Sequence, residues 1–454
     1  MKNTLITLSI SLFGLISYAQ GPAITAWLQN TSETGSYYIA GNGDAIDNGI
    51  LVNCQQVEYS TVYVYVTCTG VPAYPTGPFQ DGNPSQAEDQ STIFKLTLNP
   101  EPETGENQTT TAGTIGIFIN GVSLYDYRDG VAWNPNTEAL CGGPGNPPCP
   151  GGMGTAQDWN RDAIPAENAG FDCSKGHPAM GDYHHHQNPS AFDLDLVELS
   201  DVCDIHAADG LYVINPNEHS PLIGYAYDGY PIYGAYGYAN ADGSGGITRI
   251  KSGYSLRNIT ERVTHADGSA VDQGPDVDNT YFLGYFREDY EFITNSSEEY
   301  LDEHNGRFCT TPEYPDGIYA YFCAVDENYN SVYPYAVGPS FYGVYTNASV
   351  NSIDENTTVY SGVNSIETTD LNNMSIGIYP NPVSDLLAVQ IHGLNNEEIK
   401  AELLDLTGKL ITTFTISKGS TVGYLDVQSI YSGKYLLKLE SKGTFRTEEV
   451  VIQR

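Results

Sequence analysis

The sequence has few positive charges. Its 454 residues include 19 Lys and Arg against 56 Asp and Glu, which gives a formal net charge of −37 at pH 7. Proteins that bind nucleic acid neutralise phosphates with Lys and Arg, so we expect no nucleic-acid partner. An acidic surface attracts cations and keeps proteins apart in solution, and solubility is the interpretation we favour for most of the carboxylates.

Long apolar runs and familiar catalytic motifs are also scarce. Beyond residue 19, no segment approaches the roughly 18 apolar residues of a transmembrane helix, so no membrane span is expected. The chain lacks the G-x-S-x-G, P-loop and H-E-x-x-H motifs, which are signatures of α/β-hydrolases, phosphate-binding loops and zinc metalloproteases. The sequence alone does not decide whether the protein is an enzyme.

Residues 1–19 are predicted to be a secretory signal peptide, because a basic start precedes the apolar run Leu5–Ile16 and the small-residue site Ser17–Ala19. Eight cysteines follow, and an even number in an exported protein favours disulfides. Short loops are the easiest to close, which favours three pairs: Cys54 with Cys68, Cys141 with Cys149, and Cys309 with Cys323. The other connectivities stay open. The absence of a C-x-x-C pair disfavours a cysteine zinc site.

The secondary-structure pattern is mainly β. Short alternating runs, many Gly and Pro turns and 35 tyrosines favour strands over helices. We expect a β-rich N-terminal region (20–109), a large middle domain (110–345), a linker rich in Ser, Thr and Asn (346–375) and a small immunoglobulin-like β-sandwich (376–454). The net charge is −36 up to residue 375 (11 Lys and Arg, 47 Asp and Glu) and −1 beyond it, which supports a boundary there.

The chemistry concentrates at Tyr183-His184-His185-His186. Successive side chains of a strand point to opposite faces, so His184 and His186 would share one face about 6 to 7 Å apart. A turn could bring His177 beside them as a third metal ligand, whereas His185 would point away. Imidazole suits zinc, copper, iron or nickel, and we take copper or zinc as the candidate ions. The alternative is a hydrogen-bonded structural cluster without metal.

Two further polar groups offer candidate ligands. Asp228 precedes Gly229 in a hairpin signal, where it could cap a turn, bind a metal or orient a metal-bound histidine. Asp302, Glu303 and His304 form a second polar stretch, which could supply ligands or an acid–base pair, or simply form a solvated turn.

The middle region resembles the YHYH domain family, named for a Tyr-His-Tyr-His motif. His185 stands where the family has its second Tyr, and His304 stands where Cys is expected in many relatives, so the two motif histidines, His184 and His186, remain. The resemblance implies no established activity. It rests on several stretches in the family's order: Gly116–Val122, Gly176–Pro178, Tyr183–His186, His219–Gly234, Glu288–Phe292, Leu301–Arg307 and Thr311–Phe322.

The C-terminal region resembles the type IX secretion system (Por) sorting domain. The opening motif is Ile378–Asp385, and Leu406–Lys409 and Ser432–Tyr435 fit its later strands. The resemblance implies recognition by the outer-membrane export machinery, followed by release or attachment to surface lipopolysaccharide. We therefore expect a secreted or cell-surface protein that binds a metal ion. The alternatives are a noncatalytic glycan- or surface-polymer-binding module and a purely structural component, both with structural histidines.

Overall fold

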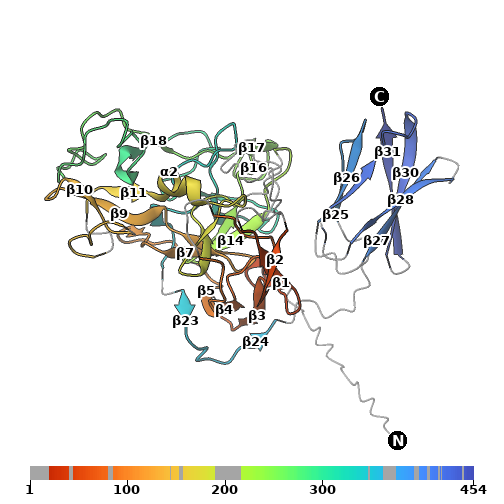
Figure 1. Cartoon of the computed structure of the whole chain (residues 1–454), viewed down its shortest axis with the longest axis horizontal. Coiled ribbons are helices and arrows are strands. Elements are labelled where there is room, and N and C mark those ends of the chain that lie inside the picture. Colours follow the sequence, from red (N-terminus) through yellow and green to blue (C-terminus); the bar gives the residue numbers. More distant parts are fainter. Residues whose placement is uncertain are drawn as a thin grey trace, which may run out of the picture. The chain divides into compact units, whose positions relative to one another are not determined.

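The protein is represented by a computed structural model that describes residues 20–39, 44–79, 85–143, 145–152, 157–189, 216–345, 348–360, 375–392, 398–405, 409–417, 420, 422–441 and 444–453. These residues form two compact units, within Met1–Tyr360 and Ser361–Arg454. Strands dominate both units (Figure 1), which confirms the mainly β prediction. The described helices are short: α1 (Pro22–Thr25), α2 (Ala163–Glu167) and the 3₁₀ helices η1 (Asn168–Gly170) and η3 (Arg287–Asp289).

An eight-stranded sheet forms the centre of the first unit, with strand order β12-β13-β8-β7-β14-β15-β21-β20. Side chains on both faces of its middle strands are buried, as in sheets covered on both sides. The strands are β7 (Thr114–Phe118), β8 (Ser123–Tyr125), β12 (His177–Ala179), β13 (Asp182–His185), β14 (Leu222–Ala226), β15 (Pro231–Tyr233), β20 (Gly306–Cys309) and β21 (Ile318–Phe322).

The two halves of this sheet have the same connectivity. β7 and β8 form an antiparallel pair, β13 lies parallel to β8, and β12 lies antiparallel to β13. β14, β15, β21 and β20 repeat these relationships in the same order. The halves meet where β7 pairs antiparallel with β14, with Ile117 opposite Tyr225. The sheet therefore has an approximate internal twofold symmetry.

A five-stranded sheet from the N-terminal region packs against the central sheet. Its order is β23-β5-β4-β3-β24, and Val57, Val64 and Val66 belong to the same buried cluster as Ile117 and Phe118. Its two edge strands come from the segment predicted as a linker. The strands are β3 (Cys54–Tyr59), β4 (Tyr63–Cys68), β5 (Thr92–Thr97), β23 (Ser349–Val350) and β24 (Thr358–Val359).

Smaller sheets complete the first unit. One of them is the three-stranded sheet β10-β9-β11, and the others are pairs. The strands are β1 (Thr34–Tyr37) with β2 (Ile46–Leu51), β6 (Gln108–Thr109) with β22 (Ser340–Phe341), β9 (Arg128–Asn134) with β10 (Ala139–Cys141) and β11 (Asn160–Asp162), β16 (Tyr236–Tyr238) with β17 (Ile247–Arg249), and β18 (Tyr254–Leu256) with β19 (Tyr290–Phe292).

The second unit is the predicted β-sandwich. Two antiparallel sheets, β25-β26-β29 and β28-β27-β30-β31, enclose a separate apolar core. Alternate residues of β26, β27 and β30, among them Leu387, Val389, Leu403, Leu437 and Leu439, are buried in this core, as strand geometry requires. The strands are β25 (Ser375–Tyr379), β26 (Leu386–His392), β27 (Ile399–Asp405), β28 (Leu410–Ile416), β29 (Val422–Asp426), β30 (Gly433–Ser441) and β31 (Thr444–Ile452).

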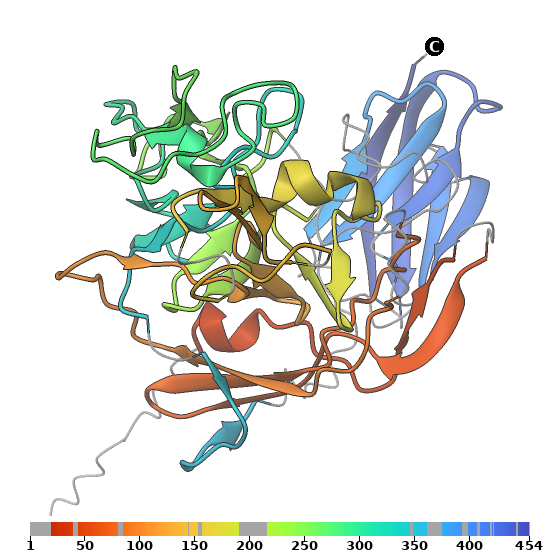
Figure 2. The ribbon, with the colours of Figure 1, turned by 60° about the vertical axis from the view of Figure 1, so that its left-hand side comes forward.

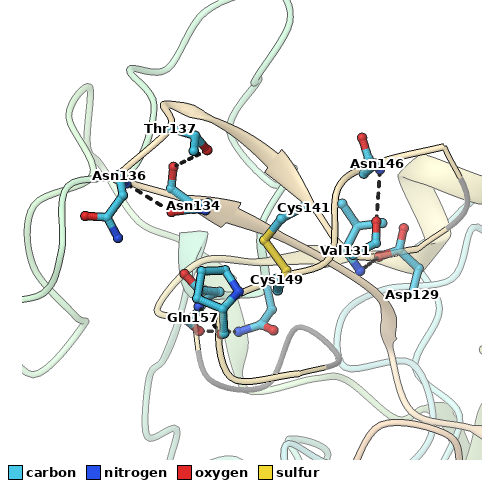
Figure 3. Close-up of a disulfide and its surroundings, with 12 residues drawn as sticks. Asp129, Val131, Asn134, Asn136, Thr137, Cys141, Asn146, Cys149 and Gln157 are labelled. Carbon is cyan, nitrogen blue, oxygen red and sulfur yellow. Dashed lines mark hydrogen bonds between the residues drawn. A yellow bond between two sulfur atoms is a disulfide. The ribbon is translucent and has the colours of Figure 1, made fainter.

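One of the three expected disulfides is present. Cys141 and Cys149 are bonded and close the loop after β10 (Figure 3), where Asn146 Nδ2 also donates to Gly142 O at 3.0 Å. Cys173 is disulfide-bonded as well.

The other two expected pairs are unbonded, so these pairings are wrong for this structure. Cys54 and Cys68 lie opposite each other on β3 and β4 with their sulfurs 3.3 Å apart, but both remain thiols. Cys309 and Cys323 are buried free thiols. Cys309 lies opposite Ile318, so the hairpin register does not place the two cysteines opposite each other.

Candidate metal centre

The histidine-rich stretch lies on β13 and just beyond it. Tyr183 and His185 point to one side, where Tyr183 Oη donates to Asp172 and His185 Nε2 lies 2.8 Å from Tyr74 Oη. His185 Nδ1 contacts Lys175 O at 3.0 Å. Both ring nitrogens of His185 are therefore used within the fold. The strand alternation leaves the neighbouring histidines on the opposite face.

His177, His184 and His186 come together on that opposite face. The β12–β13 hairpin places His177 directly across from His184. One ligand atom from each of the three rings lies within 4.8 Å of the others, and all three residues are buried. His184 Nε2 and His186 Nε2 are 3.2 Å apart. The structure thus brings together the three histidines that the sequence singled out.

Backbone carbonyls fix the orientation of two of these rings. His184 Nδ1 donates to Asp182 O at 2.8 Å, and His186 Nδ1 donates to Asp126 O at 2.5 Å. A carbonyl oxygen only accepts, so each Nδ1 must carry the hydrogen, and in the neutral ring Nε2 presents a lone pair. Metal-binding histidines commonly donate their second ring nitrogen in this way. Both Nε2 atoms are therefore oriented as ligands.

Glu167 is a fourth polar residue at the site. It ends α2, which begins where the Asp162 side chain accepts a hydrogen bond from Ile164 N at 2.9 Å. Figure 2 shows this helix beside the β12–β13 hairpin. Glu167 Oε2 lies 3.3 Å from His177 Nε2 and 3.2 Å from His186 Nε2. The carboxylate therefore reaches the histidines from a separate element of the chain.

Sequence reasoning missed Glu167. It lies in the short segment Ala163–Glu167, outside any recognised metal motif. The signal in the sequence was weak: Asp162 is a good helix N-cap, and a helix starting there would end near the carboxylate. Nothing in the spacing connects that helix to the β12–β13 hairpin.

Several polar atoms at the site are buried without a hydrogen bond. Both ring nitrogens of His177 and Oε2 of Glu167 lack a well-aligned partner despite their close approach. Buried polar atoms are nearly always satisfied in proteins, and the exceptions call for an explanation such as an ion. A cation among these atoms would satisfy Glu167 Oε2 and one of the two ring nitrogens of His177.

The carboxylate of Glu167 and the histidine rings shift one another's pKa values. Burial, reinforced by the neighbouring His186 and His177, lowers the pKa of His184 well below its usual value. Burial also acts to lower the pKa of His186, but contact with Glu167 outweighs it and raises that pKa. Burial alone would raise the pKa of Glu167, but its contacts with His177 and His186 lower it. His184 is therefore neutral and Glu167 is charged at physiological pH.

Aromatic rings wall the site. Tyr125 stacks on His184 with ring centroids 3.8 Å apart, and Phe171 meets His177 edge-on at 4.9 Å. The Tyr125 hydroxyl donates to Asp182 at 2.8 Å, which fixes the stacked ring. These contacts restrict the rings to the orientation that the hydrogen bonds select.

The other candidate from the sequence, Asp228, is used elsewhere. Tyr321 Oη and Gly343 N donate to its Oδ2 at 2.6 and 2.8 Å. Burial raises the pKa of Asp228 to about 6. The histidine cluster found among the described residues contains only His177, His184 and His186, so the structure does not bring Asp228 to it.

The stretch around Asp302 forms a loop. Tyr319 Oη donates to both carboxylate oxygens of Asp302, at 2.9 and 3.0 Å. His304 Nδ1 lies 2.8 Å from Ser340 Oγ, and His304 Nε2 lies 3.7 Å from Glu303. Asp302, Glu303 and His304 line an open groove of about 440 Å³, but Asp302 and His304 Nδ1 already have partners within the fold.

Comparison with protein-family models assigns both units. The model described as YHYH protein matches residues 93–333, just over half of the chain, and the one described as secretion system C-terminal sorting domain matches residues 377–453. No curated protein matches the chain. No helix in the described part of the chain is long and apolar enough to span a membrane. The sorting domain indicates type IX secretion to the cell surface or beyond. The chain belongs to the YHYH protein family.

Proposed function

We propose that this exported protein binds one transition-metal ion through His177, His184 and His186. The observation that carries the proposal is the fixed orientation of two rings, whose Nδ1 atoms donate to backbone carbonyls while their Nε2 atoms face each other at 3.2 Å. When both rings are neutral, these two atoms present facing lone pairs, which a single cation would satisfy. Asp228 is not part of the proposed site, because hydrogen bonds from Tyr321 and Gly343 occupy it.

The ligand chemistry favours zinc or copper. Neutral imidazole binds zinc, copper, iron and nickel, and three histidines are a common ligand set for catalytic zinc. A bound ion would supply Lewis acidity, activation of water or, for copper, redox chemistry. The chain's own contribution is to hold the three rings in place and, through the Tyr125 and Phe171 walls, to limit access of water.

Calorimetric titration of the full-length, metal-stripped protein with Zn²⁺ and Cu²⁺ tests the proposal. We expect saturation at one ion per chain, and loss of this binding in the His184→Ala/His186→Ala variant. The matched control is His219→Ala, because His219 contacts Tyr233 and Tyr238 instead of the cluster. A parent protein that binds neither ion, or a double variant that binds like the parent, would contradict the proposal.

A further inference from the structure

We infer that Glu167 is the fourth ligand of the ion and the one that an incoming water or small anion replaces. This rests on the proposed function, since it requires an ion at the three histidines. The inference adds Glu167, which no sequence motif identifies, to the ligands. It also places the exchangeable ligand position on the side of the site where Glu167 lies.

Three of the separations between candidate ligand atoms match those around a tetrahedral ion. Zinc lies about 2.0–2.2 Å from histidine nitrogens and carboxylate oxygens, which puts neighbouring ligand atoms of a tetrahedron about 3.3 to 3.5 Å apart. His184 Nε2 to His186 Nε2 is 3.2 Å, His186 Nε2 to Glu167 Oε2 is 3.2 Å, and Glu167 Oε2 to His177 Nε2 is 3.3 Å. These are three of the six separations among the four ligand atoms, and through His177 and His186 they connect Glu167 to the histidine cluster.

One hydrogen cannot serve both contacts of His186 Nε2. In the neutral ring, His186 Nε2 has no hydrogen, because Nδ1 donates to Asp126 O. The same nitrogen faces both His184 Nε2 and Glu167 Oε2 at 3.2 Å. Protonating His186 would supply one hydrogen for two acceptors. A cation satisfies both contacts, together with the unpartnered Nε2 of His177, which lies 3.3 Å from Glu167 Oε2.

Glu167 is the ligand nearest to solvent. Its side chain is 25% exposed, against 9% for His177 and 3% for His186. It also ends the five-residue helix α2, whereas His177 and His184 are paired within the sheet. With Glu167 bound, a tetrahedral ion has no open position, and catalytic sites need one. Release of this carboxylate would open that position toward solvent.

Co²⁺ substitution tests the role of Glu167 independently of any activity, because four-coordinate Co²⁺ absorbs visible light more strongly than five- or six-coordinate Co²⁺. We would load the full-length protein and its Glu167→Gln and Glu167→Ala variants with Co²⁺, and titrate each with azide. Glu303→Gln is the matched control, because this carboxylate is 53% exposed and lies 3.7 Å from a different histidine, His304.

Loss of even an outer-shell partner typically weakens metal binding at least roughly 10-fold. We therefore expect the Glu167 variants to bind Co²⁺ at least about 10-fold more weakly, with a changed spectrum and tighter azide binding than the parent. Glu303→Gln should match the parent in all three respects. If the parent binds one Co²⁺ and Glu167→Gln has the same affinity, spectrum and azide response, Glu167 is not a ligand and the three-histidine site stands. If the parent binds no Co²⁺, no Zn²⁺ and no Cu²⁺, the proposed function itself fails.

Discussion

The two halves of the eight-stranded sheet share a framework, but among the described residues only the first half brings three histidines together on it. In the first half, Asp172 Oδ1 accepts from Ser174 N and Gly176 N at 2.9 and 3.2 Å. In the second half, Asp302 accepts from the corresponding amides of His304 and Gly306, also at 2.9 and 3.2 Å. Each carboxylate also accepts from a tyrosine on the neighbouring strand.

In each half, the tyrosine that donates to the carboxylate also leaves room only for a glycine in the loop. A Cβ at Gly176 would lie 2.4 Å from Tyr183 Oη, and a Cβ at Gly306 would lie 2.3 Å from Tyr319 Oη. Carbon and oxygen cannot approach so closely without displacement of the ring. Tyr183 thus has a structural counterpart in Tyr319, so the first residue of the Tyr-His-His-His motif serves the framework.

The histidines have no such counterparts. His177 lies opposite His184 on β12 and β13, whereas Arg307 lies opposite Ala320 on β20 and β21. Phe322 comes three residues after Tyr319, just as His186 comes three residues after Tyr183, so Phe322 takes the place of His186 in the second half. Residues common to both halves therefore maintain the sheet, and the residues specific to the first half are those that face the proposed ion.

The largest expected effect is loss of the shared framework. Asp172→Ala and Asp302→Ala each leave at least three buried donors without an acceptor. Because hydrogen bonds to a charged group contribute about 1.5–3 kcal/mol each, the loss of three should cost each variant about 4.5 to 9 kcal/mol of unfolding free energy in urea titrations. A loss below about 1 kcal/mol in either half would refute the shared role.

The next effect is stabilisation by metal, which should depend on the first half alone. Zinc at about 1,000 times its dissociation constant should stabilise the parent by about 4 kcal/mol. His184→Ala should abolish this gain, and His304→Ala, from the loop of the second half, should keep it. Calorimetric melting with and without zinc measures both. An equal gain in all three proteins would show that zinc acts elsewhere.

A third prediction concerns the hairpin turns, where Asn120 in the first half stands where Asp228 stands in the second. Both side chains accept from the amide two residues later, at 3.2 and 3.3 Å, so Asp228→Asn should fold. The pKa of Asp228 is raised by burial to about 6 in the folded state, against about 3.9 unfolded. The native protein therefore binds this proton more tightly than the unfolded chain does. Protonation of Asp228 stabilises the fold at low pH, and this stabilisation is lost as the pH rises from about 4 to about 6.

This contribution amounts to at most about 3 kcal/mol. Relative to the parent, Asp228→Asn should therefore gain stability between pH 4 and pH 7, as measured by urea unfolding at both values. If the difference between parent and variant is independent of pH, the carboxylate does not titrate as described. Asp172 titrates in both proteins and cancels from the comparison.

The smallest effect is expected at the stacked tyrosines. Tyr125→Phe removes the hydroxyl that donates to Asp182, whose carbonyl orients His184. Loss of one such bond, about 1 kcal/mol, should weaken zinc binding about fivefold in calorimetric titrations. Tyr233→Phe, its counterpart in the second half, should leave zinc affinity unchanged. Equal effects of the two substitutions would contradict a site confined to the first half.

Much of the local structure was predictable from the sequence. Alternation along a strand is a short-range property, so it correctly separates His185 from His184 and His186. The β-sandwich and both family assignments likewise follow from local patterns and motifs.

The tertiary relationships were not predictable. Glu167 reaches the histidines because α2 packs beside a hairpin that follows it, and no spacing encodes that contact. The internal symmetry is hidden because Tyr319 and Gly306 recur without the histidines. Asp228 looked like a ligand in sequence, but Tyr321 and Gly343 bind it from later in the chain.

Elemental analysis of the full-length exported protein, purified without chelators, tests the central claim most directly. The account predicts one equivalent of a transition metal in the parent and none in the His184→Ala/His186→Ala variant. No metal in the parent, even after incubation with zinc and copper, or an undiminished metal content in the variant, would contradict it.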